Sequence, residues 1–100
     1  MLPIKYTYKN LSDKDKDFTQ KYLPTKLDRF KTLLTRYIEE DCRLEVKAEA
    51  FATKAAYKVD LALYIPSNTI RASEDDHTLN EAIDLAVDKL IIQLRKLVNR

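Results

Sequence analysis

Glycine is absent from this 100-residue sequence. Its absence excludes the phosphate-binding loops of P-loop and dinucleotide-binding proteins, because those loops need backbone that only glycine supplies. Nucleotide-dependent chemistry and bound cofactors are therefore not expected. Cysteine occurs once, so no internal disulfide can form. That residue, Cys42, belongs to an alternating apolar pattern, which favours a small buried side chain over a reactive thiol.

Histidine also occurs once, as His77, next to the acidic run Glu74-Asp75-Asp76. A histidine beside carboxylates could act as a general base or hold a metal ion. No second histidine or cysteine stands at ligand spacing, so we expect a solvated histidine. The acidic runs 39–41 and 74–76 could bind a divalent cation, but solvated charge is the better interpretation. The sequence predicts no catalytic residue, no metal site, no small-molecule substrate and no enzymatic activity.

Long apolar runs are missing as well: none approaches the roughly 20 residues that span a bilayer, and the first residues lack a signal peptide's apolar region. We expect no membrane partner and a cytoplasmic location. The sequence is 45% hydrophobic and 34% charged, which is ordinary for a folded domain, and we expect one domain over residues 1–100. The net charge is only +2, so any binding to nucleic acid depends on where the basic residues lie.

What the sequence does contain is alternation of apolar and polar residues, which predicts strands with one buried face. The predicted strands are Leu2–Tyr8, Cys42–Ala50, Tyr57–Ile65 and Thr69–Ser73, with a polar turn over Glu74–Thr78. The second and third strands form a hairpin with its tip at Thr53-Lys54. The tyrosines of the first and third strands alternate in phase with aliphatic residues, which favours packing under helices over stacking on bases. Tyr64 and Phe51 are expected on the opposite side, too few for a stacking platform.

The first helix is expected from Asp13 to about Tyr37, with Ser12 as its N-cap. Pro24 lies inside that range and predicts a kink near Gln20–Leu23 or a break after Tyr22, because proline removes a backbone hydrogen bond. A stripe of apolar residues at helical spacing forms its buried side: Leu23, Leu27, Phe30 and Leu34.

The last helix is a long amphipathic run that begins after Thr78, a suitable cap, and ends at the C-terminal residue. Its predicted core face consists of Leu79, Ala82, Ile83, Ala86, Leu90, Leu94 and Leu97. The sequence therefore predicts an α+β two-layer sandwich with the order β-α-β-β-β-α. A four-stranded mixed sheet carries both helices on one face, and mixed charges make its other face a solvated surface.

The last helix and the strand before it carry a motif: Ile70, Ala72-Ser73, Ala82-Ile83-Asp84, Asp88-Lys89-Leu90, Gln93-Leu94 and Lys96. This pattern resembles the ribosome hibernation-promoting factors, also called ribosome-associated inhibitors or sigma-54 modulation proteins. Lys26-Leu27-Asp28-Arg29-Phe30 is similar to a second motif of that family, K-L-E-x-Y/F. The resemblance covers nearly the whole chain, as a short form or as the N-terminal domain of a longer one.

The resemblance implies a translation inhibitor whose partner is the small ribosomal subunit and its ribosomal RNA. Such a protein occupies the messenger- and transfer-RNA channel near the decoding centre. From charge alone, the basic residues of the two helices are better interpreted as an ordinary charged surface. The resemblance reverses that preference in favour of RNA binding. The residues expected to contact RNA are Lys21, Lys26, Arg29, Lys89, Arg95, Lys96 and Arg100.

The sequence departs from the family pattern at Ile92, which stands where the family commonly has arginine, and Leu85 lies on the same flank of the helix. The lysine-rich tail that commonly follows the last helix in the family is also not seen in this sequence. Two alternatives to the ribosome-binding interpretation stay open. The first is a protein-interaction module that uses this flank of the last helix. The second is a general binder of double-stranded RNA, since helices on one face of a sheet also occur in that class.

Overall fold

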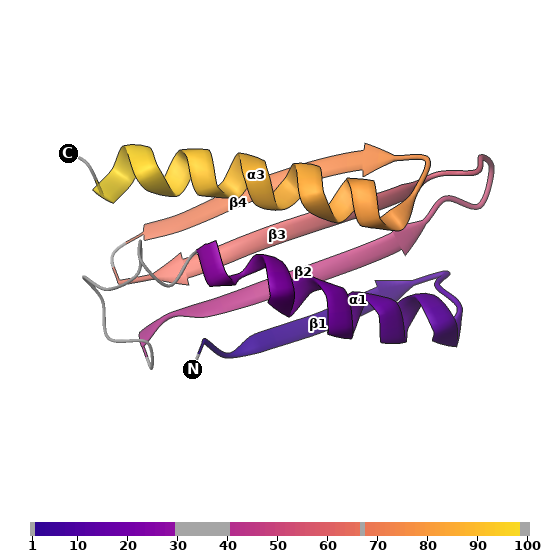
Figure 1. The fold of residues 1–100 in the computed structure, drawn as a ribbon, viewed down its shortest axis with the longest axis horizontal. Coiled ribbons are helices and arrows are strands. Elements are labelled where there is room, and N and C mark those ends of the chain that lie inside the picture. The colour runs from indigo at the N-terminus through magenta and orange to yellow at the C-terminus, as the bar shows by residue number, and fades with distance from the viewer. Residues whose placement is uncertain (1, 30–40, 67, 99–100) are drawn as a thin grey trace.

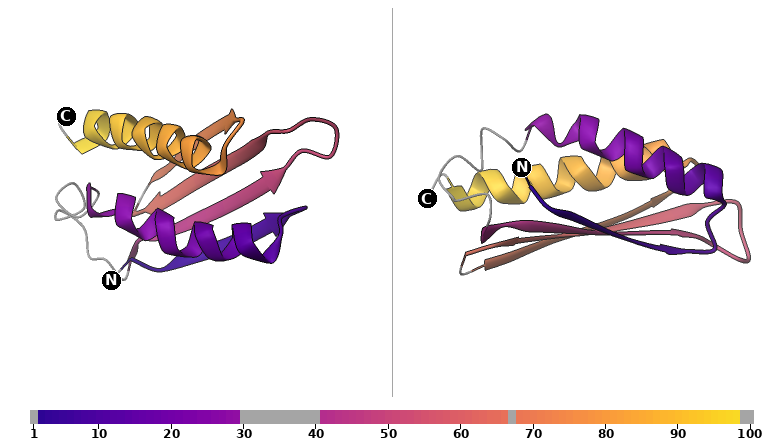
Figure 2. Two further views of the ribbon diagram at one scale, coloured as in Figure 1. Left: turned by 45° about the vertical axis from the view of Figure 1, so that its right-hand side comes forward. Right: turned by 90° about the horizontal axis from the view of Figure 1, so that it is seen from below.

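The computed structural model describes residues 2–29, 41–66 and 68–98. Within them, four strands form one mixed sheet in the order β1-β2-β3-β4, with β1 (Ile4–Lys9), β2 (Arg43–Ala50), β3 (Tyr57–Ile65) and β4 (Asn68–Asp76). β1 runs parallel to β2, and the other two pairs are antiparallel. Helices α1 (Asp13–Lys26) and α3 (Leu79–Val98) lie side by side on one face of the sheet (Figures 1 and 2). The predicted fold class is confirmed.

Alternation along the strands decides which face the helices cover. In β2, for example, Leu44, Val46 and Ala48 are buried under the helices, while Arg43 and Lys47 are exposed on the open face. Tyr6, Tyr8 and Tyr57 are half-buried and pack against the core, as expected from their phase. Cys42 is buried in the same core, which confirms its predicted place.

The turn between β1 and α1 needs one residue with a positive φ, and Asn10 supplies it at 58°. Asparagine tolerates this left-handed conformation better than most other residues, which matters in a chain without glycine. The helix then begins as predicted, because the Ser12 hydroxyl accepts a hydrogen bond from the Asp15 backbone N–H at 3.1 Å.

Pro24 does not break α1, so the predicted break after Tyr22 is wrong. The helix continues through Pro24 and ends at Lys26, where the Leu27 backbone N–H bonds to the Pro24 carbonyl oxygen at 3.2 Å. Pro24 lies in the last turn, and only the Gln20 carbonyl loses its usual partner there. The predicted extension to Tyr37, with Phe30 and Leu34 on its apolar side, falls on residues 30–40, outside the described residues.

The predicted polar turn over Glu74–Thr78 is also wrong in most of its length. β4 extends to Asp76, and Lys58 of β3 stands opposite Asp75. Lys54 forms an ion pair with Asp75 at 3.8 Å, and Lys89 forms one with Glu74 at 3.2 Å. Opposite charges across the strands let an acidic segment pair as a strand, despite a composition typical of turns.

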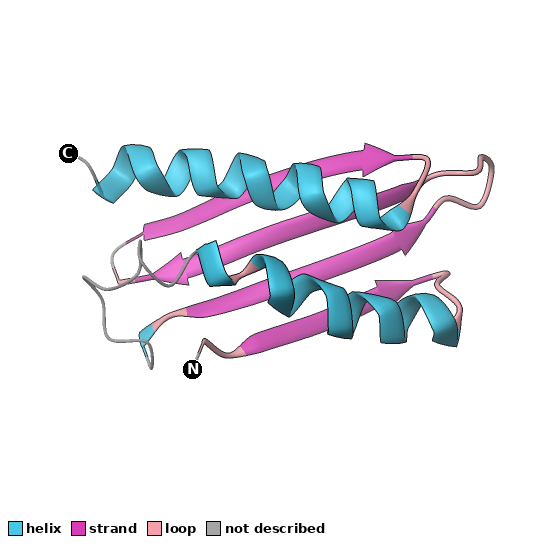
Figure 3. Cartoon of the chain, in the orientation of Figure 1, coloured by secondary structure: helices cyan, strands magenta, loops and turns pink. Residues whose placement is uncertain are grey.

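α3 lies over β3 and β4 (Figure 3). The predicted face of the helix packs in the core. The side chains of Ile83, Leu90 and Leu94 are fully buried, and Leu97 is half-buried at the edge of the core. The Thr78 hydroxyl caps the helix by accepting a hydrogen bond from the Glu81 backbone N–H at 3.3 Å. This rigid packing fixes which sides of both helices face solvent.

Candidate nucleic-acid interface

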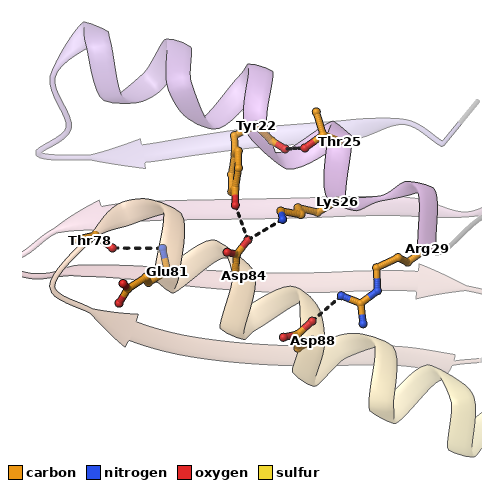
Figure 4. Close-up of polar contacts among 8 residues, drawn as sticks. All are labelled: Tyr22, Thr25, Lys26, Arg29, Thr78, Glu81, Asp84 and Asp88. Carbon is orange, nitrogen blue, oxygen red and sulfur yellow. Dashed lines mark hydrogen bonds and ion pairs between the residues drawn. The ribbon is translucent and has the colours of Figure 1, made fainter.

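The exposed sides of α1 and α3 meet in a groove, where basic residues at the end of α1 and just beyond it contact acids of α3 (Figure 4). Lys26 Nζ lies 3.4 Å from Asp84 Oδ1, and Arg29 Nη1 lies 2.5 Å from Asp88 Oδ1. Val87 completes this groove, which has a volume of about 180 Å³. We call it the interhelical groove. Two of the predicted RNA-contacting residues, Lys26 and Arg29, are thus already paired in the free protein.

Tyr22 lies at the end of the interhelical groove that contains Asp84. Its hydroxyl donates a hydrogen bond to Asp84 Oδ1 at 2.7 Å, and Lys26 Nζ lies 5.0 Å from the centre of its ring. Partial burial raises the pKa of the Tyr22 hydroxyl, and its hydrogen bond to Asp84 raises it further. Hydrogen bonding to Tyr22, together with the charge of Asp84, raises the pKa of the Lys26 ammonium. Both groups therefore keep their protons at neutral pH.

A second set of predicted residues lies on the far flank of α3, away from α1. Leu85, Lys89, Ile92 and Lys96 follow one another at spacings of four, three and four, which puts them on one side of the helix. We call these four residues the α3 flank. Leu85 and Ile92 are 43% and 53% exposed, so the α3 flank presents apolar as well as basic side chains to solvent. Lys89 pairs with Glu74 of β4 at 3.2 Å, while Lys96 is exposed.

The remaining predicted residues occupy three further places. Lys21 is exposed on α1 and pairs with Asp17 at 2.9 Å. Arg95 is exposed on α3, seven residues after Asp88 and so on the same side of the helix. In the described part of the chain, neither Arg95 nor Lys96 takes part in an ion pair. Arg100 lies outside the described residues.

The open face of the sheet is a different kind of surface. Its charges are mixed, and the lining of a hollow of about 610 Å³ includes Glu45, Asp60 and Arg71 from the sheet, together with Lys89 of α3. Tyr64 lies on this face with the Arg43 guanidinium 4.1 Å from its ring centre. One tyrosine held by an arginine is not a row of aromatic rings for bases, which agrees with the sequence analysis.

The other candidate groups are His77 and the two acidic runs, and residues 39 and 40 of the first run lie outside the described residues. His77 is exposed, and one ring nitrogen lies 3.4 Å from the Ala55 carbonyl oxygen. In the regions that the structure describes, no three histidine, cysteine or acidic residues gather as metal ligands do. Over the same regions, no helix combines the length and apolar character needed to cross a membrane.

Sequence reasoning missed the acidic half of the interhelical groove. Asp84 and Asp88 were visible as part of the last motif, but their pairing with Lys26 and Arg29 depends on how the helices pack. One signal was available in the spacing. Asp84 and Asp88 lie four residues apart and therefore on one side of α3. Arg29 follows the end of α1 at Lys26, so its direction could not be inferred from helical spacing.

Comparison with known proteins agrees with this geometry. Residues 4–100 match the family described as sigma 54 modulation protein / S30EA ribosomal protein. The crystal structure of the Thermus thermophilus Protein Y N-terminal domain superposes with a TM-score of 0.71 at 27% sequence identity, covering 97% of this chain and 99% of that one. The structure of a ribosomal subunit interface protein from Coxiella burnetii gives a TM-score of 0.67 at 19% identity, covering 99% and 100%. The second likeness supports the fold alone.

The fold and the match together define the class: a two-layer α+β domain of a ribosome-associated family. The chain belongs to the sigma 54 modulation protein / S30EA ribosomal protein family. This confirms the family inferred from the motifs in β4 and α3.

Proposed function

We propose that this protein is a translation inhibitor that binds small-subunit ribosomal RNA near the decoding centre and keeps messenger and transfer RNA out. The family match over residues 4–100 carries the proposal. The mechanism needs no catalysis: a rigid domain occupies the channel, and contacts to RNA phosphates hold it there. Because its partner is the ribosome, the proposed location is the cytoplasm.

The surface that meets RNA is the solvent side of the two helices. It carries Lys21, Lys26 and Arg29 from α1 and just beyond it, and Lys89, Arg95 and Lys96 from α3. When lysine and arginine side chains contact phosphates, they release the counterions that surround the RNA. This release supplies most of the affinity of non-specific binding. Lys96 and Arg95 are exposed and outside any ion pair of the described residues, so they contact phosphates without first losing a partner.

A double charge reversal on the α3 flank tests the proposal. Lys89→Glu with Lys96→Glu should abolish binding to small ribosomal subunits, because it replaces two attractive contacts by repulsion. The loss of two phosphate contacts should also reduce the salt slope of any residual binding by about 1.4–1.8. Binding is measured by co-sedimentation with purified small subunits over a range of salt concentrations.

Lys5→Glu with Lys47→Glu is the matched control, since both lysines are exposed on strands of the sheet and point away from the helices. This control changes the net charge by the same amount and should keep most of the binding. Equal loss in both double variants would mean that net charge alone governs binding. Full binding by the α3 variant, with an unchanged melting temperature, would contradict the proposed surface.

A second candidate function has one observation in its favour. Leu85 and Ile92 are large apolar side chains exposed on one flank of α3. Exposed apolar side chains that lie together are typical of protein contacts. The alternative is therefore a protein-interaction module on the same fold, and substitution of Ile92 separates it from RNA binding.

A further inference from the structure

The interhelical groove places negative charge in the middle of the surface proposed to meet RNA. Asp84 and Asp88 lie one helical turn apart on α3, and each contacts a basic residue from the end of α1 or just beyond it (Figure 4). A phosphate within about 10 Å feels both members of such a pair, because charges are screened only beyond the Debye length. For an approaching RNA, each of the pairs Lys26–Asp84 and Arg29–Asp88 therefore acts as a dipole and not as a free cation.

These ion pairs contribute little to the stability of the fold. The side chains of Arg29 and Asp88 are about half exposed, at 49% and 53%, and those of Lys26 and Asp84 are 35% and 39% exposed. Exposed pairs are worth only about 0.2–1 kcal/mol each, since water screens the attraction. Their stronger effect is on the direction of the basic side chains and on the field above the groove.

The direction from which a phosphate can bind follows from the N–H donors that the ion pairs leave unused. Arg29 contacts Asp88 through Nη1, and a guanidinium has further N–H donors in the same plane. Its bond to Asp88 holds that plane in place, so a phosphate at its outer side meets a donor that is already oriented. A phosphate that lies over the groove itself meets the carboxylates of Asp84 and Asp88 and is repelled.

We propose that Asp84 and Asp88 are selectivity residues, which lower the affinity for generic RNA and admit only a rigid RNA whose phosphates fall outside the interhelical groove. This inference rests on the proposed function and deepens it by naming what excludes the wrong RNA. Neither aspartate needs to touch the ribosome. Each acts through the basic residue that it orients and neutralises.

The experiment compares two ligands, purified small ribosomal subunits and a random-sequence duplex RNA. Asp88→Asn keeps the size of the side chain and removes its charge, and it leaves the Tyr22–Asp84 hydrogen bond in place. It should bind the duplex more tightly and with a steeper salt dependence. One additional phosphate contact makes the loss of affinity between 50 and 200 mM salt about 3.5-fold larger. Asp84→Asn should act in the same direction.

Glu81→Gln is the matched control. Glu81 lies on the same helix, carries the same charge, and pairs with no basic side chain among the described residues. In the aspartate variants the ratio of small-subunit affinity to duplex affinity should fall several-fold, while in Glu81→Gln it should change little. A fall of that ratio is not produced by a merely structural role, which would weaken both ligands together.

Two results would overturn the inference while leaving the proposed function intact: an equal effect of Glu81→Gln, or an unchanged ratio in both aspartate variants. Failure of the unmodified protein to bind small subunits would instead remove the proposed function, and the inference with it. Each outcome is read in the same assay, and melting temperatures confirm that every variant is folded.

Discussion

Replacing Pro24 by alanine should raise the free energy of unfolding. Pro24 lies within α1, three positions from the Leu27 cap, and its side chain is exposed. Alanine at this position restores the N–H that bonds to the Gln20 carbonyl and relieves the clash of the proline ring with the preceding turn. A proline inside a helix costs about 3 kcal/mol relative to alanine. Against this gain, proline reduces the entropy of the unfolded chain, which stabilises a protein by about 0.4–1 kcal/mol.

The balance predicts that Pro24→Ala raises the free energy of unfolding by about 2 kcal/mol, somewhat less if the last turn already frays. For a domain of this size, each kcal/mol raises the melting temperature by about 4–8 °C. Thermal unfolding followed by circular dichroism measures the change.

Pro24→Gly is the control for this prediction, since it restores the same N–H without the helix preference of alanine. It should gain about 1 kcal/mol less than Pro24→Ala. A melting temperature of Pro24→Ala below that of the unmodified protein would refute the reasoning. It would show that the turn at Leu27, which brings Lys26 and Arg29 to the interhelical groove, needs proline.

Two further predictions concern α3. Hydrogen bonding between Glu81 and Asp76 raises the pKa of Glu81 and lowers the pKa of Asp76. Because the pKa of Glu81 is higher in the folded protein than in the unfolded chain, the free energy of unfolding falls as the pH rises through that raised pKa. Glu81→Gln removes that charge, and the gain in melting temperature over the unmodified protein should therefore be larger at pH 7 than at pH 4; an equal gain at both would contradict it. Ile92→Arg adds a cation to the α3 flank and should strengthen small-subunit binding and steepen its salt slope. Weaker binding with an unchanged slope would favour the protein-interaction alternative, because a charge placed in an apolar contact loses its water without gaining a partner.

The strands and the core could be predicted because alternation and helical spacing are local properties. Leu44, Val46 and Ala48 of β2, and Ile83, Leu90 and Leu94 of α3, are buried as their spacing indicated. The ends of elements were harder. β4 continues through Glu74 and Asp76 because β3 offers paired positions there, and that depends on a neighbour 15 or more residues away in the sequence.

The candidate site was only half predictable for the same reason. Basic residues and exposed apolar residues such as Ile92 can be recognised from their places on a helical wheel. The pairing of Lys26 with Asp84 and of Arg29 with Asp88 joins residues 58 and 59 positions apart, and only the packing of the two helices brings them together. The sequence therefore located the cations but did not reveal that acids of α3 neutralise Lys26 and Arg29.

We propose that this domain binds the small ribosomal subunit through contacts to RNA phosphates. The most direct measurement is co-sedimentation of the unmodified protein with purified small and large subunits, each over a series of salt concentrations. The protein should pellet with small subunits at low salt and should be released progressively as the salt concentration rises. Protein that remains in the supernatant with small subunits at low salt, where electrostatic binding is strongest, would contradict it.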